Sequence, residues 1–230
     1  MTDWISFWDT SHSIYVNARH RDVHYRIIAE DLRTCVPSPH AIVMDYGCGE
    51  ALHADLIAAA AAKLVLVEAA PGVVAGLAAR FAAEPKIEVI TPDRLVGFPE
   101  HSIDLIVLHS VVQYLSADTL HVLLVAFRRL LKRNGLLIAG DIIPPSQSPL
   151  SDAWSLIRLA GANGFLGAAL VGLMRTLKSD YSRLRARLGI ARYDQPTMMR
   201  RLADAGFSAE RAVRNVGHNQ GRMTVLARAA

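Results

Sequence analysis

Residues 41–51 read Ala-Ile-Val-Met-Asp-Tyr-Gly-Cys-Gly-Glu-Ala, and this stretch decides the fold. Four apolar residues lead into Asp45, which two glycines one residue apart follow. A short apolar run bounded by glycine predicts a buried parallel strand and a tight turn. The Ala- and Leu-rich residues 51–62 predict a helix after that turn. A strand–turn–helix unit of this kind presents backbone N–H groups to a ligand.

A second acid follows at the distance that a nucleoside-binding sheet requires. Residues 63–68 read Lys-Leu-Val-Leu-Val-Glu and predict the next strand, with Glu68 at its tip, 21 positions after Gly47. An acid in that place can accept hydrogen bonds from a ribose diol. The glycine turn and Glu68 together therefore predict a cofactor that contains a nucleoside.

Length, composition and cysteine content narrow the class of protein. At 230 residues and 52% hydrophobic content, the chain can build one sizeable core and is not a disordered chain. Its two cysteines, Cys35 and Cys48, form no disulfide framework and favour a reducing compartment. The first residues lack a basic segment followed by an apolar one, so no signal peptide is predicted and we expect a cytoplasmic protein.

The positive charge of the chain is concentrated in one segment. The whole chain has a net charge of +4, whereas residues 175–201 alone hold eight basic and two acidic residues. A local excess of this kind argues against a nucleic-acid footprint over the core, so no nucleic-acid partner is expected. It leaves open an anionic substrate or an anionic membrane surface.

Apolar runs and helical patterns alternate along the chain, which predicts an α/β fold with a parallel sheet and helices on both faces. The last two strands are expected to be antiparallel, with residues 217–221 as a hairpin turn between them. The expected strands are residues 42–46, 64–68, 87–91, 103–109, 136–141, about 211–216, and 223–228. The expected helices are residues 22–33, 51–62, 71–83, 117–132 and 195–205, with a long helical stretch at 154–177.

Three blocks carry a family resemblance. Asp45-Tyr-Gly-Cys-Gly49 resembles the D-x-G-x-G signature of class I S-adenosylmethionine (SAM)-dependent methyltransferases. Residues 102–115 and 130–141 are similar to that family's fourth-strand block and to its turn into the fifth strand. Ala51 departs from the pattern, since the family usually has glycine there. The resemblance covers about residues 41–143 and 196–230, and it implies a Rossmann-like seven-stranded sheet and SAM as cofactor.

The resemblance also implies how the chain is divided. We expect one methyltransferase domain, residues 1–230, in which residues 1–40 form an N-terminal cap and residues 41–143 the cofactor-binding core. Residues 144–195 are expected to form a helical insertion over the substrate, and residues 196–230 to complete the core.

The same resemblance assigns a set of cofactor-binding residues. Asp93 would contact the adenine amine, with Arg94 and Leu95 beside the ring, and Arg19 would pair with the carboxylate of SAM. Glu68 also fits a second interpretation, as an acid stabilised at the start of the next helix. Likewise, Asp45 could simply order its own turn. The expected cofactor-binding residues are Tyr15, Arg19, Asp45, Gly47, Cys48, Gly49, Glu68, Ala69, Asp93, Arg94, Leu95 and His109.

His109 is the leading candidate for a catalytic residue. It stands at the end of the expected fourth strand, where side chains face the ligand crevice of an open parallel sheet. A hydroxyl acceptor must lose a proton, and histidine suits that task at neutral pH. Tyr114 is a second candidate for an active-site contact. His20 and His24 lie four residues apart without a further ligand pair, so no metal is predicted.

The insertion contains a long apolar segment whose role the sequence leaves open. Residues 156–174 hold a single charge, Arg158, and their length would suffice to span a bilayer. Several glycines interrupt the segment, so we expect a lid over a small or lipid-like acceptor. Peripheral contact with the inner face of the membrane through residues 154–192, and homodimerisation, stay open.

The sequence therefore predicts a SAM-dependent methyltransferase that acts without metal on an oxygen or nitrogen of a small or lipid-like molecule. One alternative is an NAD(P)-dependent oxidoreductase, because Gly47, Gly49 and Glu68 also fit a degenerate dinucleotide fingerprint. A third glycine and a Tyr-x-x-x-Lys pair are missing from that pattern. The other alternative is a catalytically inactive methyltransferase-like scaffold.

Overall fold

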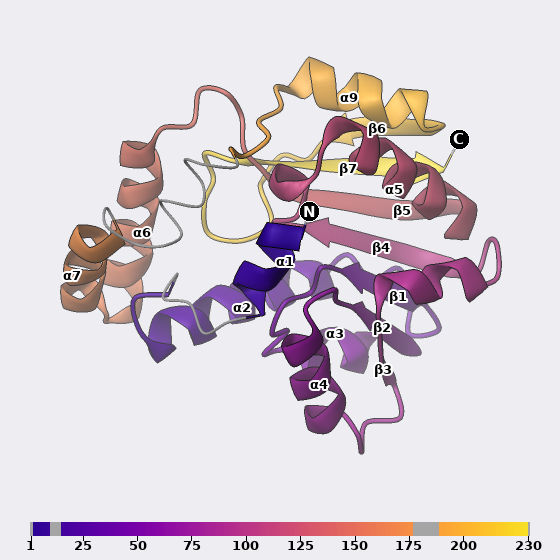
Figure 1. Cartoon of the computed structure of the whole chain (residues 1–230), viewed down its shortest axis with the longest axis horizontal. Helices are drawn as coiled ribbons and strands as arrows, with labels where there is room; N and C mark the ends of the chain where they lie inside the picture. Colours follow the sequence, from indigo (N-terminus) through magenta and orange to yellow (C-terminus); the bar gives the residue numbers. More distant parts are fainter. Residues whose placement is uncertain (1, 10–14, 177–188, 230) are drawn as a thin grey trace.

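The computed structural model describes residues 2–9, 15–176 and 189–229, and within them seven strands form one sheet (Figure 1). The strand order is β3-β2-β1-β4-β5-β7-β6, with β1 to β5 parallel and β7 antiparallel to both β5 and β6. The predicted mostly parallel, seven-stranded sheet is thereby confirmed. The strands are β1 (Ile42–Tyr46), β2 (Lys63–Val67), β3 (Ile87–Ile90), β4 (Ile103–His109), β5 (Leu131–Ile142), β6 (Phe207–Arg211) and β7 (Met223–Ala229).

Helices cover both faces of the sheet because its central strands are apolar on both sides (Figure 1). In β2, Leu64 packs into the core on the side of α2, α3 and α4, whereas Val65 packs into the core on the side of α5 and α9. The core helices are α2 (Ala18–Arg33), α3 (Ala54–Ala60), α4 (Pro71–Arg80), α5 (Ala117–Leu130) and α9 (Gln195–Asp204). A short helix, α1 (Thr2–Trp8), lies near the carboxyl end of β4.

The apolar insertion forms two helices instead of the single expected stretch at 154–177. These are α6 (Pro149–Asn163) and α7 (Leu166–Thr176). Gly164, which caps α6 with a φ of +73°, breaks the stretch because a left-handed residue ends a helix. Both helices pack against Val23 of α2, together with Phe165, which lies between α6 and α7. Within the described ranges, no helix is both long and apolar enough to cross a membrane.

Part of the predicted basic segment, and part of the membrane-contact segment 154–192, lies outside the described residues, namely 177–188.

The C-terminal pair of strands differs from its prediction in the residues that form the first of the two strands. Strand β6 covers residues 207–211, and not 211–216. Gly206, with a φ of +83°, turns the chain directly from α9 into the strand, and Phe207 is buried in the core. The predicted tight turn at 217–221 is therefore part of a longer connection, residues 212–222, that reaches the carboxyl ends of β4 and β5.

Candidate active site

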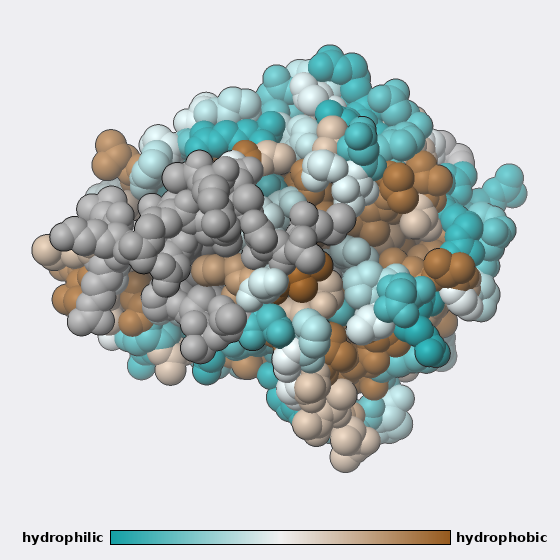
Figure 2. Space-filling view, in the orientation of Figure 1, coloured by the Kyte–Doolittle hydropathy of each residue, from teal (hydrophilic) through white to brown (hydrophobic). Residues whose placement is uncertain are grey.

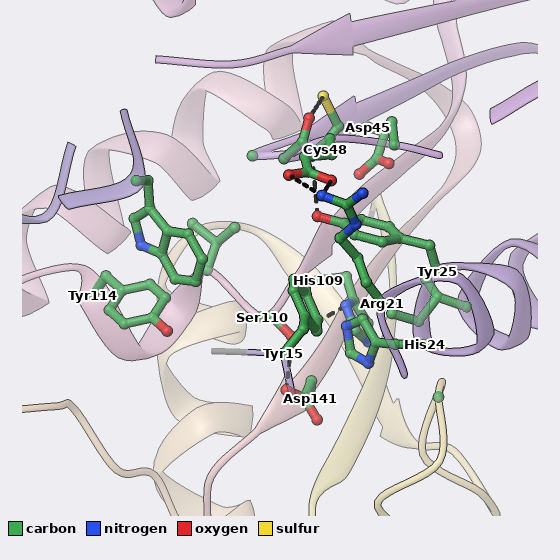
Figure 3. A pocket seen from close by; sticks show the side chains of 18 of the residues that line it. Tyr15, Arg21, His24, Tyr25, Asp45, Cys48, His109, Ser110, Tyr114 and Asp141 are labelled. Atoms are coloured by element: carbon green, nitrogen blue, oxygen red, sulfur yellow. Dashed lines mark hydrogen bonds and ion pairs between the residues drawn. The ribbon is translucent and has the colours of Figure 1, made fainter. Parts of the chain in front are cut away.

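A cavity of about 1340 Å³ opens at the carboxyl ends of β1, β2, β4 and β5. Ligands of open parallel sheets bind at this edge. A site for one small ligand usually measures about 300–1,000 Å³, so this cavity has room for a cofactor and an acceptor together. Figure 3 shows that side chains from α2, the glycine turn, β4 and β5 converge on it.

The glycine turn forms one wall of the cavity. Gly47 and Gly49 have φ angles of +72° and +56°, in the left-handed region that glycine adopts without strain. A Cβ atom at Gly47 would lie 2.4 Å from Cγ2 of Val111, which requires a residue without a side chain. Ala51 also has a positive φ, of +41°, which is a strained value for alanine.

Glu68 holds the glycine turn in place. Its carboxylate accepts hydrogen bonds from the backbone N–H groups of Gly49 (2.9 Å), Ala69 (2.7 Å) and Ala70 (3.0 Å). The acid thus connects the tip of β2 to the turn after β1 and to the start of α4. Glu68 and Ala69 line the cavity as expected, while the ribose contact of Glu68 stays a prediction.

The side chain of Asp45 faces the cavity without a hydrogen bond to any residue that the structure describes, so it does not order its own turn (Figure 3). Burial raises the pKa of Asp45 to about 7, and the charge of Glu68 adds to the shift. An opposite charge would reverse this effect, so the carboxylate is suited to a cationic ligand. Cys48 is buried beside it and donates from Sγ to the carbonyl of Gly49 at 3.6 Å.

The N-terminal segment contributes Tyr15 to the cavity lining, whereas Arg19 lies outside that lining, and its contact with SAM stays a prediction. Arg19 is exposed and lies near Gly164 at the end of α6. Arg21 lines the cavity instead and pairs with Glu50 at 3.4 Å. The reason is helical geometry, because two residues that are two positions apart on α2 point about 200° apart around the helix axis.

The residues that are expected to contact adenine also lie outside the cavity lining. They lie in the short helix η1 (Pro92–Gly97), of which only Pro92 lines the cavity. Asp93 and Arg94 are exposed outside the lining, and Leu95 is buried in the core on the α5 side of the sheet. The side chain of Leu95 is therefore used for packing, and the adenine contacts of these residues stay a prediction.

His109 lies in the cavity wall, as predicted, but protein atoms contact both of its ring nitrogens. Nε2 is 3.2 Å from the carbonyl oxygen of Val216, and Nδ1 is 3.2 Å from Oγ of Ser110. Ser110 in turn donates to Asp141 at 2.7 Å. Burial lowers the pKa of His109, and the charge of Asp141 opposes that shift. This geometry suits an orienting residue, and the role of His109 as a base stays a prediction.

Ser110 and Asp141 have φ angles of +59° and +61°, which are strained values for residues other than glycine. Ser110 directly follows β4, and Asp141 lies near the end of the neighbouring strand β5. Their hydrogen bond joins the two strand ends. Strain of this kind persists only where the surrounding structure enforces it, and it is concentrated at functional sites.

Asp141 belongs to a charged network that the sequence did not reveal. Arg222 donates to Asp141 at 2.5 Å and to Asp152 of α6 at 3.3 Å. Asn215 donates to Asp141 at 3.4 Å, and Asn219 donates to Asp152 at 2.8 Å. Burial by itself would raise the pKa of Asp141, but Arg222, His109 and Ser110 together hold that pKa below its usual value. Asp141 ends a predicted strand and could have been noticed for that reason, whereas nothing marked Arg222.

Four further histidines line the cavity: His20, His24, His53 and His218. The rings of His24 and His218 lie 5.7 Å apart. Burial, and then the charge of His218, lowers the pKa of His20 to about 4 and that of His24 to about 3. Among the described residues, no group of three or more His, Cys, Asp or Glu is arranged to hold a metal ion.

Helix α1 covers the cavity next to Tyr114. The rings of Trp4 and Trp8 lie 4.5 Å and 5.8 Å from the ring of Tyr114, and all three residues line the cavity. Tyr114 is thus placed at the candidate active site, as predicted, and its catalytic role stays a prediction.

Part of the chain is similar to a known protein family. Residues 44–139 match the family model of a methyltransferase domain. A comparison with curated protein sequences gave no match.

Solved structures with a similar fold include methyltransferases. An N-methyltransferase, NodS from Bradyrhizobium japonicum, bound to S-adenosyl-L-homocysteine, is 15% identical over 98% of this chain and 95% of its own, with a TM-score of 0.59. A putative O-methyltransferase from Nostoc punctiforme is 16% identical over 98% of this chain and 60% of its own, with a TM-score of 0.60. The pyocyanin biosynthetic protein PhzM is 16% identical over 89% of this chain, which spans 55% of PhzM, with a TM-score of 0.59.

Proposed function

We propose that this chain is a class I SAM-dependent methyltransferase with SAM as its cofactor, and that it methylates an oxygen or nitrogen of a small or lipid-like molecule. The match of residues 44–139 to a methyltransferase domain supports this proposal. The observation that carries the proposal is that the glycine turn lines the same cavity as several histidines and the acids Asp141 and Asp152. A donor site and an acceptor site in one cavity are what a direct transfer requires.

The residues at the glycine turn fit SAM. SAM carries a sulfonium and an ammonium group, and the unpaired carboxylate of Asp45 would neutralise part of that charge. Glu68 keeps the turn open for the ligand by accepting three backbone hydrogen bonds. When bound, SAM supplies an electrophilic methyl group, while the chain orients the acceptor, excludes water and removes a proton.

The other end of the cavity supports an acceptor with an apolar part. Leu150 and Leu156 of α6 and Leu173 and Met174 of α7 line it. Leu150 is 81% exposed and Met174 is 76% exposed, so the apolar lining continues to the outer surface. Figure 2 shows hydrophobic residues at this end of the molecule. The division into a core, a cap and a substrate-covering insertion at 144–195 is part of this proposal.

Titration with SAM and with NAD(H), followed by calorimetry, tests the cofactor assignment. We expect the wild type to bind SAM and Glu68→Gln to bind it at least about ten-fold more weakly, because an ionised acceptor is worth more than a neutral one. Glu88→Gln is the matched control, since Glu88 of β3 pairs with Lys63 of β2 and neither residue lines the cavity. Tight NAD(H) binding without SAM binding would contradict the proposal.

A SAM-turnover screen against lipid, polyketide and small-metabolite pools tests the reaction itself. Transfer of methyl to a hydroxyl or amine compound supports the proposal. A protein that binds SAM yet transfers methyl to none of these pools is instead the inactive scaffold.

A further inference from the structure

His218 stands out among the cavity histidines because its ring nitrogens are available. It lies on the connection 212–222, lines the cavity, and has no hydrogen-bond partner among the described residues. By contrast, His109 contacts Val216 and Ser110 through both nitrogens. A base needs a free lone pair within reach of the reacting group, so His109 is poorly placed for that task.

His20 is also engaged. Its Nδ1 accepts a hydrogen bond from the backbone of Val16 at 3.3 Å, and its ring stacks on Phe165 at 5.4 Å. The lone pair of Nδ1 is therefore used inside the N-terminal segment. His53 also lines the cavity, but its Nε2 lies 2.8 Å from Oδ1 of Asp22. This leaves His24 and His218 as the cavity histidines neither of whose ring nitrogens has a hydrogen-bond partner in the described part of the chain.

The surrounding charges distinguish these two. Burial, Arg222 and His109 lower the pKa of His218, whereas the carboxylates of Asp141 and Asp152 stabilise a proton on its ring. His24 lies mainly among other histidines, with Asp141 as the acid near it. Burial lowers the pKa of both rings, so both are neutral at pH 7, but only His218 gains a positive charge next to two acids. The charged and titratable groups that face His218 are His20 and His24 of α2, His109 of β4, Asp141 of β5, Asp152 of α6 and Arg222 before β7.

We propose that His218 is the catalytic base that takes the proton from the acceptor during methyl transfer; this inference rests on the proposed function. The acceptor oxygen or nitrogen forms a bond to the methyl carbon as the carbon–sulfur bond breaks, and the electron pair of that bond stays on sulfur. The proton of the acceptor moves to the free ring nitrogen of His218, and water later removes it. His109 acts as a positioning residue that holds Val216, and with it the 212–222 connection, against β4.

The first test is chemical and does not depend on turnover. Diethyl pyrocarbonate acylates neutral imidazoles that are accessible, and mass spectrometry locates the product. At pH 7 we expect His218 to be modified several-fold faster than His109 and His20 in the wild-type protein. Modification of His109 ahead of His218 would overturn the proposal.

The second test uses an acceptor found in the turnover screen. We expect His218→Gln to lower kcat by about 10²–10⁴-fold while SAM affinity stays within two-fold. The acidic limb of the pH–rate profile should disappear in this variant, and added imidazole should restore part of the activity of His218→Gly. His121→Gln is the matched control, because His121 is exposed on α5.

The outcomes separate the two proposals. Absence of methyl transfer by the wild type defeats the proposed function and the assignment of His218 with it. Transfer that survives His218→Gln, or a loss seen with His24→Gln alone, defeats only the assignment.

Discussion

The two halves of the cavity are built in different ways. The cofactor half lies between residues 45 and 70, where one carboxylate, Glu68, binds three backbone N–H groups. The acceptor half draws on α2, β4, β5, α6 and the connection 212–222, and its side chains bind one another. A site made of neighbouring backbone is stable through its own turn, whereas a site made of distant side chains depends on the whole fold.

This difference suggests that mutations will separate the halves. Loss of a side chain in the acceptor half should affect global stability, because its charged side chains are largely buried and pair with one another. Changes at the glycine turn should act on cofactor binding and on local strain.

Arg222→Met should have the largest effect, because it leaves Asp141 and Asp152 without the cation between them. We expect a loss of about 3–5 kcal/mol in the free energy of unfolding, measured by urea denaturation. Arg200→Met, on the exposed face of α9, should change it by less than about 0.5 kcal/mol. An equal loss in both variants, or a folded Arg222→Met protein that no longer binds SAM, would contradict the separation of the halves.

Asp45→Asn should stabilise the ligand-free protein in a way that depends on pH. The pKa of Asp45 is raised to about 7 in the folded protein, so the acid favours folding below its unfolded value of 3.8 and loses that contribution as pH rises through 7. The variant should therefore gain about 2–4 kcal/mol over the wild type at pH 8 and almost nothing at pH 4, by urea denaturation at each pH.

The control for this prediction is Asp204→Asn, an exposed acid at the end of α9 that should show no such trend. SAM affinity of the wild type should also rise with pH through 7, because the ionised carboxylate attracts the cationic ligand. A gain from Asp45→Asn that is equal at pH 4 and pH 8 would refute the explanation.

Gly47→Ala tests a place where the two halves touch. The new methyl group would meet Val111, next to Ser110, and the backbone would be strained at a φ of +72°. We expect a destabilisation of about 1–3 kcal/mol in thermal or urea unfolding. The double variant Gly47→Ala/Val111→Ala should lose less than the sum of the two single variants, and strict additivity would show that no clash occurs.

Ala51→Gly should have the smallest effect and act only in the cofactor half. It relieves a φ of +41°, so we expect a gain of about 0.5–1 kcal/mol in the free energy of unfolding. Ala62→Gly, outside α3, serves as a comparison without a positive φ to relieve. A clear loss of stability at Ala51 would mean that packing of its buried methyl group outweighs the strain.

Sequence reasoning worked best where the signal is local. The strand before Asp45, the strand before Glu68 and the turn between them follow from apolar runs and glycines, and the structure has them in place. It worked less well where helical direction matters. Arg19 and Arg21 look alike in the sequence, but only the orientation of α2 decides which one reaches the cavity.

The sequence by itself determined the order of strands and helices and the position of the glycine turn, because each depends on residues close together in the chain. Only the tertiary structure decided the acceptor half. Arg222 meets Asp141 and Asp152 across 81 and 70 positions of sequence, and His218 reaches the cavity because β6 begins at Phe207. Contacts over such separations arise from the packing of the whole sheet, so no local sequence pattern predicts them.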